Sequence, residues 1–246
     1  MSWSFISAGT AGYSTADDPT TFQPSLPTSY TTGDLLLLLL CNRDPTDPLV
    51  TAPSGYTLLG TDDAGSLTGG ILIYGKIAVS ASETAPAISF SSMSLCNYHM
   101  AAFRDSNGVT TLGSITHVLA KGDTASNANT TITYPAATIT VDDCLVIIAG
   151  RKSKAISEAS TVDAEAGFTE ISEYRRAVAS SQVSVWNYAI QTTAANITSG
   201  TWNFATGTWT EGSRDERALT LALLSSAASG SHKFVGKFGG KLRGKI

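Results

Sequence analysis

Residues 33–43 read GDLLLLLLCNR, and residues 142–151 read DDCLVIIAGR. Each stretch starts with an acidic turn, continues as an unbroken apolar run and ends on a basic residue. The longer run, Leu35–Cys41, has seven residues, whereas a membrane-spanning helix needs about 20. Because neither run alternates apolar with polar residues, we expect two central β-strands that are covered on both faces.

Strand-like segments also fill the rest of the chain. They are short, rich in Ile, Val, Leu, Thr, Tyr and Trp, and bounded by Gly, Pro, Asn or Asp. No long window keeps a helical period; residues 153–165 come nearest and are expected to form a loop. The sequence therefore predicts an all-β chain. The expected strands are residues 4–8, 21–23, 35–42, 56–60, 71–79, 87–91 and 96–104, and then 115–119, 130–134, 144–150, 168–173, 182–191, 201–205 and 218–225.

Five landmarks occur twice, in the same order and about 110 residues apart, which is typical of an internal duplication. The pairs are Thr20-Thr21-Phe22 with Thr130-Thr131-Ile132, residues 33–43 with 142–151, Gly55-Tyr56-Thr57 with Gly167-Phe168-Thr169, Ile71-x-Ile73-Tyr74 with Val183-x-Val185-Trp186, and Ile88-Ser89-Phe90 with Trp202-Asn203-Phe204. Each copy would then hold about seven strands, as in an antiparallel β-sandwich of the jelly-roll kind.

The duplication predicts the domain organisation. We expect two tandem antiparallel β-sandwich domains, residues 1–108 and 109–228, followed by an extended C-terminal arm, residues 229–246. The second cover that each central run needs can come from the other copy, in which case the two sandwiches pack side by side.

Charge divides the chain into an acidic body and a basic tail. Residues 1–230 carry 11 basic and 20 acidic residues, whereas residues 231–246 carry five basic residues and no acidic one. Charged residues make up 15% of the chain, against ~25% in an average protein, and 42% are hydrophobic. This composition argues against disorder and against a nucleic-acid-binding body. The N-terminal sequence MSWSFISAGTAG lacks the basic start and apolar stretch of a signal peptide.

Three cysteines, Cys41, Cys96 and Cys144, lie inside apolar segments. Their odd number and the lack of a Cys-x-x-Cys spacing argue against a disulfide framework and against a zinc site. We expect small buried thiols in a reducing compartment. The alternative is a Cys41–Cys96 disulfide, which requires that their strands are neighbours.

Residues with catalytic chemistry are sparse. The three histidines, His99, His117 and His232, show no HxH or HExxH spacing, and no GxSxG sequence occurs. His99 lies in an apolar segment, where we expect a hydrogen-bonded core or edge residue. Residues 236–241, GKFGGK, resemble a phosphate-binding loop but are one residue too short and lack the Ser or Thr that binds magnesium. We expect no enzymatic activity, no cofactor and no metal.

Acidic pairs are the candidate calcium ligands, because calcium prefers several oxygen ligands. Three such pairs occur: Asp17-Asp18, Asp62-Asp63 and Asp142-Asp143. Asp142-Asp143 precedes a strand at the place where the first copy has Gly33-Asp34, so we interpret it as a turn instead.

Aromatic side chains suggest a sugar site, because sugar rings stack on aromatic faces. Trp186, Trp202 and Phe204 stand at positions typical of a core. Trp209, between Thr208 and Thr210, is therefore the candidate glycan-binding residue.

The last 16 residues, SHKFVGKFGGKLRGKI, contain a Lys-apolar-x-Gly repeat. In a helix each glycine would cost about 1 kcal/mol relative to alanine, whereas an extended chain places the basic and apolar side chains on opposite faces. We therefore predict an amphipathic strand. Its partner-binding residues are Lys233, Phe234, Lys237, Phe238, Lys241, Leu242, Arg243, Lys245 and Ile246.

We expect this arm to anchor the chain on a neighbouring protein by strand addition, with its lysines facing acidic groups. The alternatives are contact with an anionic membrane or with nucleic acid, and a loose tail that only adds solubility.

Four segments of the first copy resemble the sequence motifs of a protein family. Their sequences are GDLLLL at 33–38, PSGYTLL at 53–59, IYGKIA at 73–78 and MAAFR at 100–104. This order resembles the motifs GD.L, P.GW/YT.L, YYK.A and A.Y/FR of β-sandwich virion proteins of tailed bacteriophages. The second copy follows the pattern in part, since Glu165-Ala166 replaces the proline and Trp186-Asn187-Tyr188 replaces Tyr-x-Lys.

The resemblance implies a β-sandwich in a virion that is assembled in the host cytoplasm, and it carries over no catalytic residue. We predict a non-enzymatic structural protein, first of all a capsid-surface accessory protein of the decoration or head-fibre type. Its partners would be other virion proteins, either the major capsid protein or a neck or tail protein, and further copies of the chain. We expect neither a membrane nor a nucleic-acid partner. The alternative is a tail-fibre or baseplate adhesin that binds a host glycan, and a carbohydrate-binding module is a third interpretation.

Overall fold

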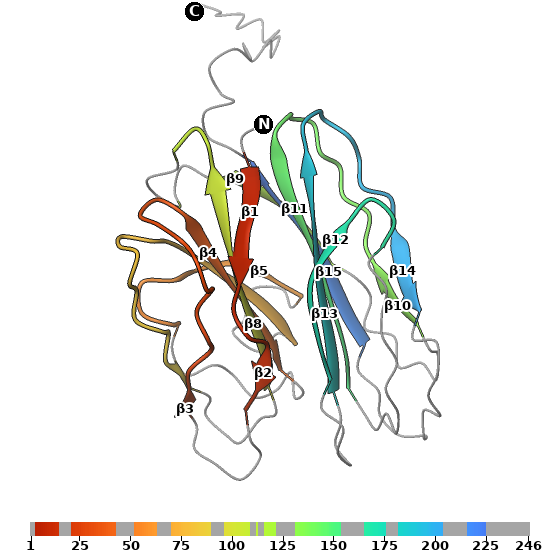
Figure 1. Cartoon of the computed structure of the whole chain (residues 1–246). Helices are drawn as coiled ribbons and strands as arrows, with labels where there is room; N and C mark the ends of the chain where they lie inside the picture. Colours follow the sequence, from red (N-terminus) through yellow and green to blue (C-terminus); the bar gives the residue numbers. More distant parts are fainter. Residues whose placement is uncertain are drawn as a thin grey trace, which may run out of the picture.

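A computed structural model describes residues 3–14, 21–42, 52–62, 70–89, 96–108, 112, 116–121, 131–153, 165–175, 182–203 and 216–224. These residues form β-strands and no α-helix, which confirms the predicted all-β class. Every expected strand is present, and β2 is an addition. The strands of Figure 1 are β1 (Trp3–Ala8), β2 (Gly12–Tyr13), β3 (Thr21–Phe22), β4 (Leu35–Asn42), β5 (Thr57–Thr61), β6 (Ile71–Ile77), β7 (Ile88–Ser89), β8 (Cys96–Asp105), β9 (Thr116–Lys121), β10 (Thr131–Tyr134), β11 (Cys144–Ser153), β12 (Thr169–Arg175), β13 (Gln182–Gln191), β14 (Gly200–Asn203) and β15 (Glu216–Leu224).

The strands form two large antiparallel sheets that share one strand order. In the first half of the chain, residues 3–108, the sheet runs β1-β8-β4-β6-β5, and β2 also pairs with β8. In the second half, residues 116–224, the sheet runs β9-β15-β11-β13-β12. Strands that follow the same order along each half therefore occupy corresponding places in the two sheets.

The apolar runs form the centres of the two sheets. β4 lies between β8 and β6, and β11 lies between β15 and β13. Side chains 35–41 and 144–149 are at most 1% exposed. The prediction that both runs are covered on both faces is confirmed.

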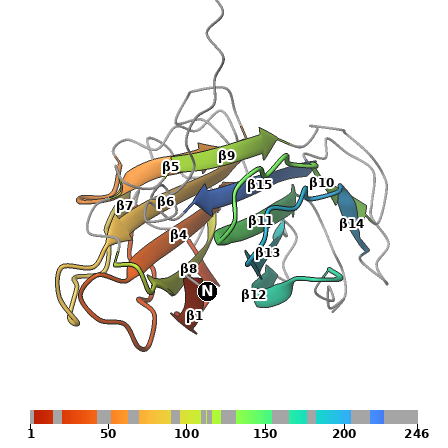
Figure 2. The same ribbon diagram turned by 90° about the horizontal axis from the view of Figure 1, so that it is seen from above.

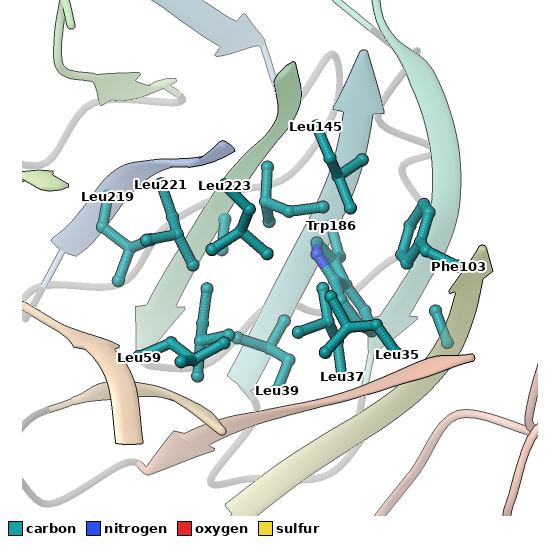
Figure 3. Packing of buried hydrophobic residues seen from close by; sticks show 14 of the residues in the cluster. Leu35, Leu37, Leu39, Leu59, Phe103, Leu145, Trp186, Leu219, Leu221 and Leu223 are labelled. Atoms are coloured by element: carbon teal, nitrogen blue, oxygen red, sulfur yellow. The ribbon is translucent and has the colours of Figure 1, made fainter. Parts of the chain in front are cut away.

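The two large sheets pack face to face, as Figure 2 shows from above, and their facing side chains form one inner core. Leucines of β4 and β15 point toward one another across this core, together with Trp186 of β13 (Figure 3). Its buried members are Trp3, Leu35, Leu37, Leu39, Cys41, Leu59, Ile71, Ile73, Ala101 and Phe103 from the first half, and Leu145, Ile147, Ala149, Trp186, Leu219, Leu221 and Leu223 from the second. Each half thus supplies the second cover for the other half, as the sequence suggested.

A two-stranded sheet contributes to an outer core on the far face of each large sheet. β3 pairs with β7 in the first half, and β10 pairs with β14 in the second. The registers correspond, because Phe22 is opposite Ile88 and Ile132 is opposite Trp202. Phe22, Ile88, Ile132 and Trp202 all pack into these outer cores.

The two outer cores place their large side chains on different strands. In the first half, Leu40 of β4 and Ile88 of β7 are both fully buried members of the outer core. In the second half, Gly150 of β11 takes the place of Leu40, and Trp202 of β14 takes the place of Ile88. A Cβ atom at Gly150 would lie 2.7 Å from Cζ3 of Trp202, so the indole occupies the space that a larger residue at 150 would need.

The same turn precedes β5 and β12. Gly55 has φ 79° and Gly167 has φ 84°, values that residues with a Cβ adopt with difficulty. Both strands then carry a bulge at the same point, between Leu58 and Gly60 and between Glu170 and Ser172. Gly55 and Gly167 therefore each stand in a like turn that leads into a bulged strand.

Two of the sequence landmarks are out of register by one residue. Ile71 and Ile73 face the inner core, whereas their expected counterparts Val183 and Val185 face an outer core. The true counterparts are Ser184 and Trp186, since a shift of one residue moves a side chain to the other face of a strand. The same correction applies to β4 and β11, where Leu35 corresponds to Leu145 and not to Cys144.

All three cysteines are buried, free thiols. β4 and β8 are neighbours, and Asn42 is directly opposite Cys96. Cys41 therefore lies on the opposite face of the sheet, in the inner core, while Cys96 lies in an outer core. The Cys41–Cys96 disulfide alternative is wrong because the two thiols are on opposite faces.

The jelly-roll detail of the prediction is not confirmed. A jelly roll places eight strands in two Greek keys, whereas the described strands of each half divide into a large sheet and a two-stranded sheet.

Within the described residues, no helix is long and apolar enough to cross a membrane.

Candidate functional site

The predicted binding residues lie outside the described residues. These are the arm, residues 229–246, and Trp209. The candidate site built from the described residues is a group of polar side chains between the two large sheets, at one end of the inner core. We call this group the polar contact; its members are Asp62, Asn97, His99, Ser172, Gln182, Ser184 and Arg217.

Two strands change from polar to apolar along their inner faces. On β8 the inner positions carry Asn97 and His99 before Ala101, and on β13 they carry Gln182 and Ser184 before Trp186. All six side chains are nearly or fully buried. Because the two strands lie against each other, their polar ends meet and their apolar ends meet.

His99 joins the two sheets through both ring nitrogens. Nδ1 makes a hydrogen bond with the Ser172 hydroxyl, and Nε2 lies 2.7 Å from Oγ of Ser184. The imidazole is 1% exposed, and burial lowers the pKa of His99 to about 3. At neutral pH the ring is therefore uncharged, with one nitrogen donating a hydrogen bond and the other accepting one.

Asn97 and Gln182 connect side chains to the backbone of the opposite sheet. Nδ2 of Asn97 donates to Oγ of Ser184 at 3.1 Å and to the carbonyl oxygen of Tyr174 at 3.3 Å. Nε2 of Gln182 donates to the carbonyl oxygen of Cys41 at 2.6 Å. These bonds run in both directions across the interface, so they fix how one sheet lies on the other.

An ion pair completes the polar contact. Oδ2 of Asp62 accepts a hydrogen bond from Nη1 of Arg217 at 3.0 Å, and Oδ1 accepts one from the backbone N–H of Ile71 at 2.8 Å. The Asp62 side chain is 1% exposed and that of Arg217 is 13% exposed. Gly70 permits the approach of Arg217, since a Cβ atom at residue 70 would lie 2.6 Å from Cδ of Arg217.

Two of the four segments 33–38, 53–59, 73–78 and 100–104 meet through an arginine and an aspartate. Arg104 grips Asp34 with two hydrogen bonds, from Nε to Oδ1 at 2.7 Å and from Nη2 to Oδ2 at 2.8 Å. The backbone N–H of Thr31 donates to Oδ2 at 2.7 Å. Although burial opposes ionisation, the bonds from Arg104 and Thr31 hold the pKa of Asp34 below its usual value.

A second group links the other two segments. Nζ of Lys76 lies 5.8 Å from the ring centroid of Tyr56 and 2.6 Å from Oε2 of Glu83. Oε1 of Glu83 accepts hydrogen bonds from the backbone N–H groups of Val79 and Ser80. Although burial opposes ionisation, Lys76 and these backbone bonds hold the pKa of Glu83 below its usual value. These four segments therefore carry residues that support the fold.

The acidic pairs have structural roles where they are described. Asp62 belongs to the polar contact, and Oδ1 of Asp142 accepts a hydrogen bond from the backbone N–H of Ala194 at 2.6 Å. Asp143 adopts φ 56°, as a turn residue can. Within the described ranges, no three His, Cys, Asp or Glu side chains are close enough to hold a metal; Asp17, Asp18 and Asp63 lie outside those ranges.

The sequence predicted part of this arrangement. His99 is a hydrogen-bonded core residue as expected, and Trp186 and Trp202 are buried as expected; Phe204 lies outside the described residues. The polar contact itself was missed. The signal was the polar pair of alternate positions, Asn97 and His99, in a strand that is otherwise apolar.

Comparisons with protein families, curated proteins and solved structures find no match for this chain. The function has to be inferred from the residues themselves.

Proposed function

We propose that the chain is a non-enzymatic structural protein of a tailed-phage particle, most readily a capsid-surface accessory protein of the decoration or head-fibre type. In this proposal a duplicated β-sandwich forms the body, and the basic arm, residues 229–246, anchors it to another virion protein. The observation that carries the proposal is that the four segments of the family resemblance form one framework. Asp34 binds Arg104, Lys76 lies over Tyr56, and the pairing of β4 with β6 joins these two contacts.

The framework supports the proposal because it gives each motif a physical reason. The GD.L segment supplies the carboxylate that the arginine of the A.FR segment grips. The GYT segment supplies the aromatic ring under the lysine of the YGK segment. A set of motifs that interlock in this way indicates a shared fold more strongly than four separate matches would, although fold alone does not determine function.

Three correspondences support the duplication. The large sheets share one strand order, β5 and β12 carry the same turn and bulge, and the two-stranded sheets share one register. These features arise in segments that are far apart in each half, so a single local coincidence does not explain them.

The arm is the proposed anchor because of its pattern. Its lysines alternate with apolar residues at a spacing that puts each kind on one face of an extended chain. Such a strand can add to the edge of a sheet in a partner, where backbone hydrogen bonds give affinity and the lysines select an acidic surface. The five positive charges of residues 231–246 are also opposite in sign to the net charge of the acidic body.

Deletion of residues 231–246 tests the anchor. We expect the truncated chain to keep the melting temperature of the full chain and to be lost from purified particles, measured by quantitative mass spectrometry against the major capsid protein. A matched variant, with Phe234, Phe238, Leu242 and Ile246 changed to Ser, keeps the charge and should also be lost. Incorporation of the truncated chain at the normal level would overturn the proposal. Electron microscopy of particles that carry a tagged chain would show whether it lies on the head or the tail.

The second candidate function is an adhesin of a tail fibre or baseplate. It is favoured by Trp209, which stands between two threonines in the sequence and was the residue best suited to stack on a sugar. An adhesin should bind host cells saturably and lose that binding in Trp209→Ala. Binding that is absent in the full chain would eliminate this candidate.

A further inference from the structure

We infer that the inner faces of the two large sheets are complementary docking surfaces, each selective for the other half and against a second copy of itself. The inference goes beyond the proposed virion role and does not depend on it, because it concerns only how the two halves of the described chain recognise each other.

The two halves pack with approximate twofold symmetry. β6 of the first half lies against β15 of the second, and β8 of the first lies against β13 of the second. Since β6 corresponds to β13 and β8 corresponds to β15, exchanging the halves exchanges these two contacts. In an interface of this kind the same patch is used on both sides, so each patch has the shape needed to meet a copy of itself.

Residue pairs follow the same exchange. Strand register makes Tyr174 the counterpart of Asp62, and Arg217 the counterpart of Asn97. Asp62 meets Arg217 at 3.0 Å, and the counterpart pair also meets, since Asn97 donates to the carbonyl oxygen of Tyr174 at 3.3 Å. The ion pair and this hydrogen bond thus occupy equivalent places on opposite sides of the interface.

The side chains at these places decide which halves can pair. Two copies of the first half would place Asp62 against Asn97 twice and provide no cation. Two copies of the second half would place Arg217 against Tyr174 twice and provide no carboxylate. Among the described residues at these places, only the mixed pair joins a buried carboxylate to a guanidinium across the interface, and a buried charge without a partner is costly.

His99 adds a second selection of the same kind. It meets Ser172 and Ser184, whose counterparts in the first half are Gly60 and Ile71. In a pair of first halves, the imidazole would therefore face a glycine and an isoleucine in place of two hydroxyl groups. Its ring nitrogens would be buried without these bonds, which disfavours that pair.

The exposed turn at residues 106–108 allows a direct test on the full chain. A protease site is inserted after Gly108, between β8 and β9, and the folded protein is cleaved there. Native mass spectrometry over a dilution series should then show one-to-one complexes of the two halves, together with free halves at high dilution. Homodimers of either half, or halves that separate as soon as they are cut, would overturn the inference.

Two matched substitutions separate docking from folding. Arg217 and Arg104 each bind an aspartate of the first half, but Arg217 reaches it from the second half and Arg104 from the first. In the cleaved protein, Arg217→Gln should raise the dissociation constant of the halves at least about tenfold, and Arg104→Gln should leave it within about twofold. Equal effects of the two substitutions would contradict selective docking.

A charge exchange keeps the inference testable if Arg217→Gln does not fold. Asp62→Arg alone should weaken the complex of halves, because it places two cations together. Adding Arg217→Asp should restore at least about tenfold of the lost affinity. A double variant that is no tighter than Asp62→Arg alone would show that the ion pair does not guide docking.

Discussion

The two ends of the interface between the large sheets are built from different chemistry. At one end, Tyr188 stacks on Phe5 with ring centroids 5.2 Å apart and meets the edge of Phe103 at 5.4 Å. At the other end, His99 and the Asp62–Arg217 pair make directed bonds across the same gap. Apolar contact is favourable in almost any close packing, whereas a directed bond is favourable only with one partner in one position.

The two ends of the interface therefore contribute to stability in different ways. Burial of large side chains supplies most of the free energy that holds the sheets together. Hydrogen bonds and ion pairs add little net energy when they are made, but they cost much when a buried partner is missing. Substitutions at the two ends should therefore differ both in size and in kind.

The largest effect is expected at Trp186, a fully buried side chain in the middle of the inner core. Trp186→Ala should lower the free energy of unfolding by about 3–5 kcal/mol, because it removes a large apolar contact and leaves a cavity. Urea denaturation measures this change, and Trp186→Phe is expected to lose less. A loss below about 1 kcal/mol for the alanine variant would show that the inner core is not the main source of stability.

The next largest effect is expected at Asp62. Asp62→Ala should cost about 2–4 kcal/mol, since it leaves the Arg217 guanidinium and the Ile71 N–H without their carboxylate partner. Asp62→Asn keeps an oxygen for the Ile71 N–H and should cost less. If denaturation gives the same midpoint for Asp62→Ala as for the unmodified chain, the polar end makes no contribution to stability.

A smaller loss is expected at the aromatic end. Tyr188→Leu keeps an apolar side chain but removes the ring contacts with Phe5 and Phe103, so the cost should be about 1–2 kcal/mol. Phe5→Leu combined with Tyr188→Leu should cost less than the sum of the two single changes, because one stacked pair is lost in each case. Strictly additive losses in thermal or urea unfolding would argue against that pair.

The smallest effect is a pH dependence that arises at the polar end. The pKa of His99 is lowered from 6.5 to about 3 in the folded chain, so between these values the unfolded chain binds the extra proton. Stability from this group is complete above pH 6.5 and is lost as the pH falls, by about 1 kcal/mol between pH 6.5 and about 5.5. Denaturation at several pH values should show this slope, and His99→Gln should flatten it. An unchanged slope in the variant would exclude His99 as its source.

The strands could be predicted from the sequence because their signals are local. The unbroken apolar run from Leu35 to Cys41 predicts a strand that is covered on both faces, whatever covers it. The residue-by-residue correspondence between β6 and β13 was harder to predict from the sequence. Ile71-x-Ile73 matches Val183-x-Val185 in sequence, but both faces of β13 are buried, and contacts with the first half make Ser184 and Trp186 the inner residues.

The polar contact could not be predicted because its partners are distant in the sequence. Asp62 and Arg217 are 155 residues apart, and His99 and Ser184 are 85 residues apart. A polar residue in an apolar strand signals that some partner exists, but only the packing of the two sheets identifies it. Residues 231–246 and Trp209 lie outside the described part of the chain, so their predicted roles stay predictions.

In the proposed duplication, the two halves carry different residues at equivalent places, Leu40 and Ile88 in the first half and Gly150 and Trp202 in the second. This difference restricts how the proposed copies could diverge. A chain with a large residue at 150 has no room for the indole, and a chain with Gly150 and a smaller residue at 202 has a void. Neither single substitution is neutral, so under that proposal the path between the two arrangements crosses a less stable intermediate or changes both sites together. A variant that carries leucine at position 150, as β4 does at Leu40, and keeps Trp202 of β14 should be less stable for the same reason.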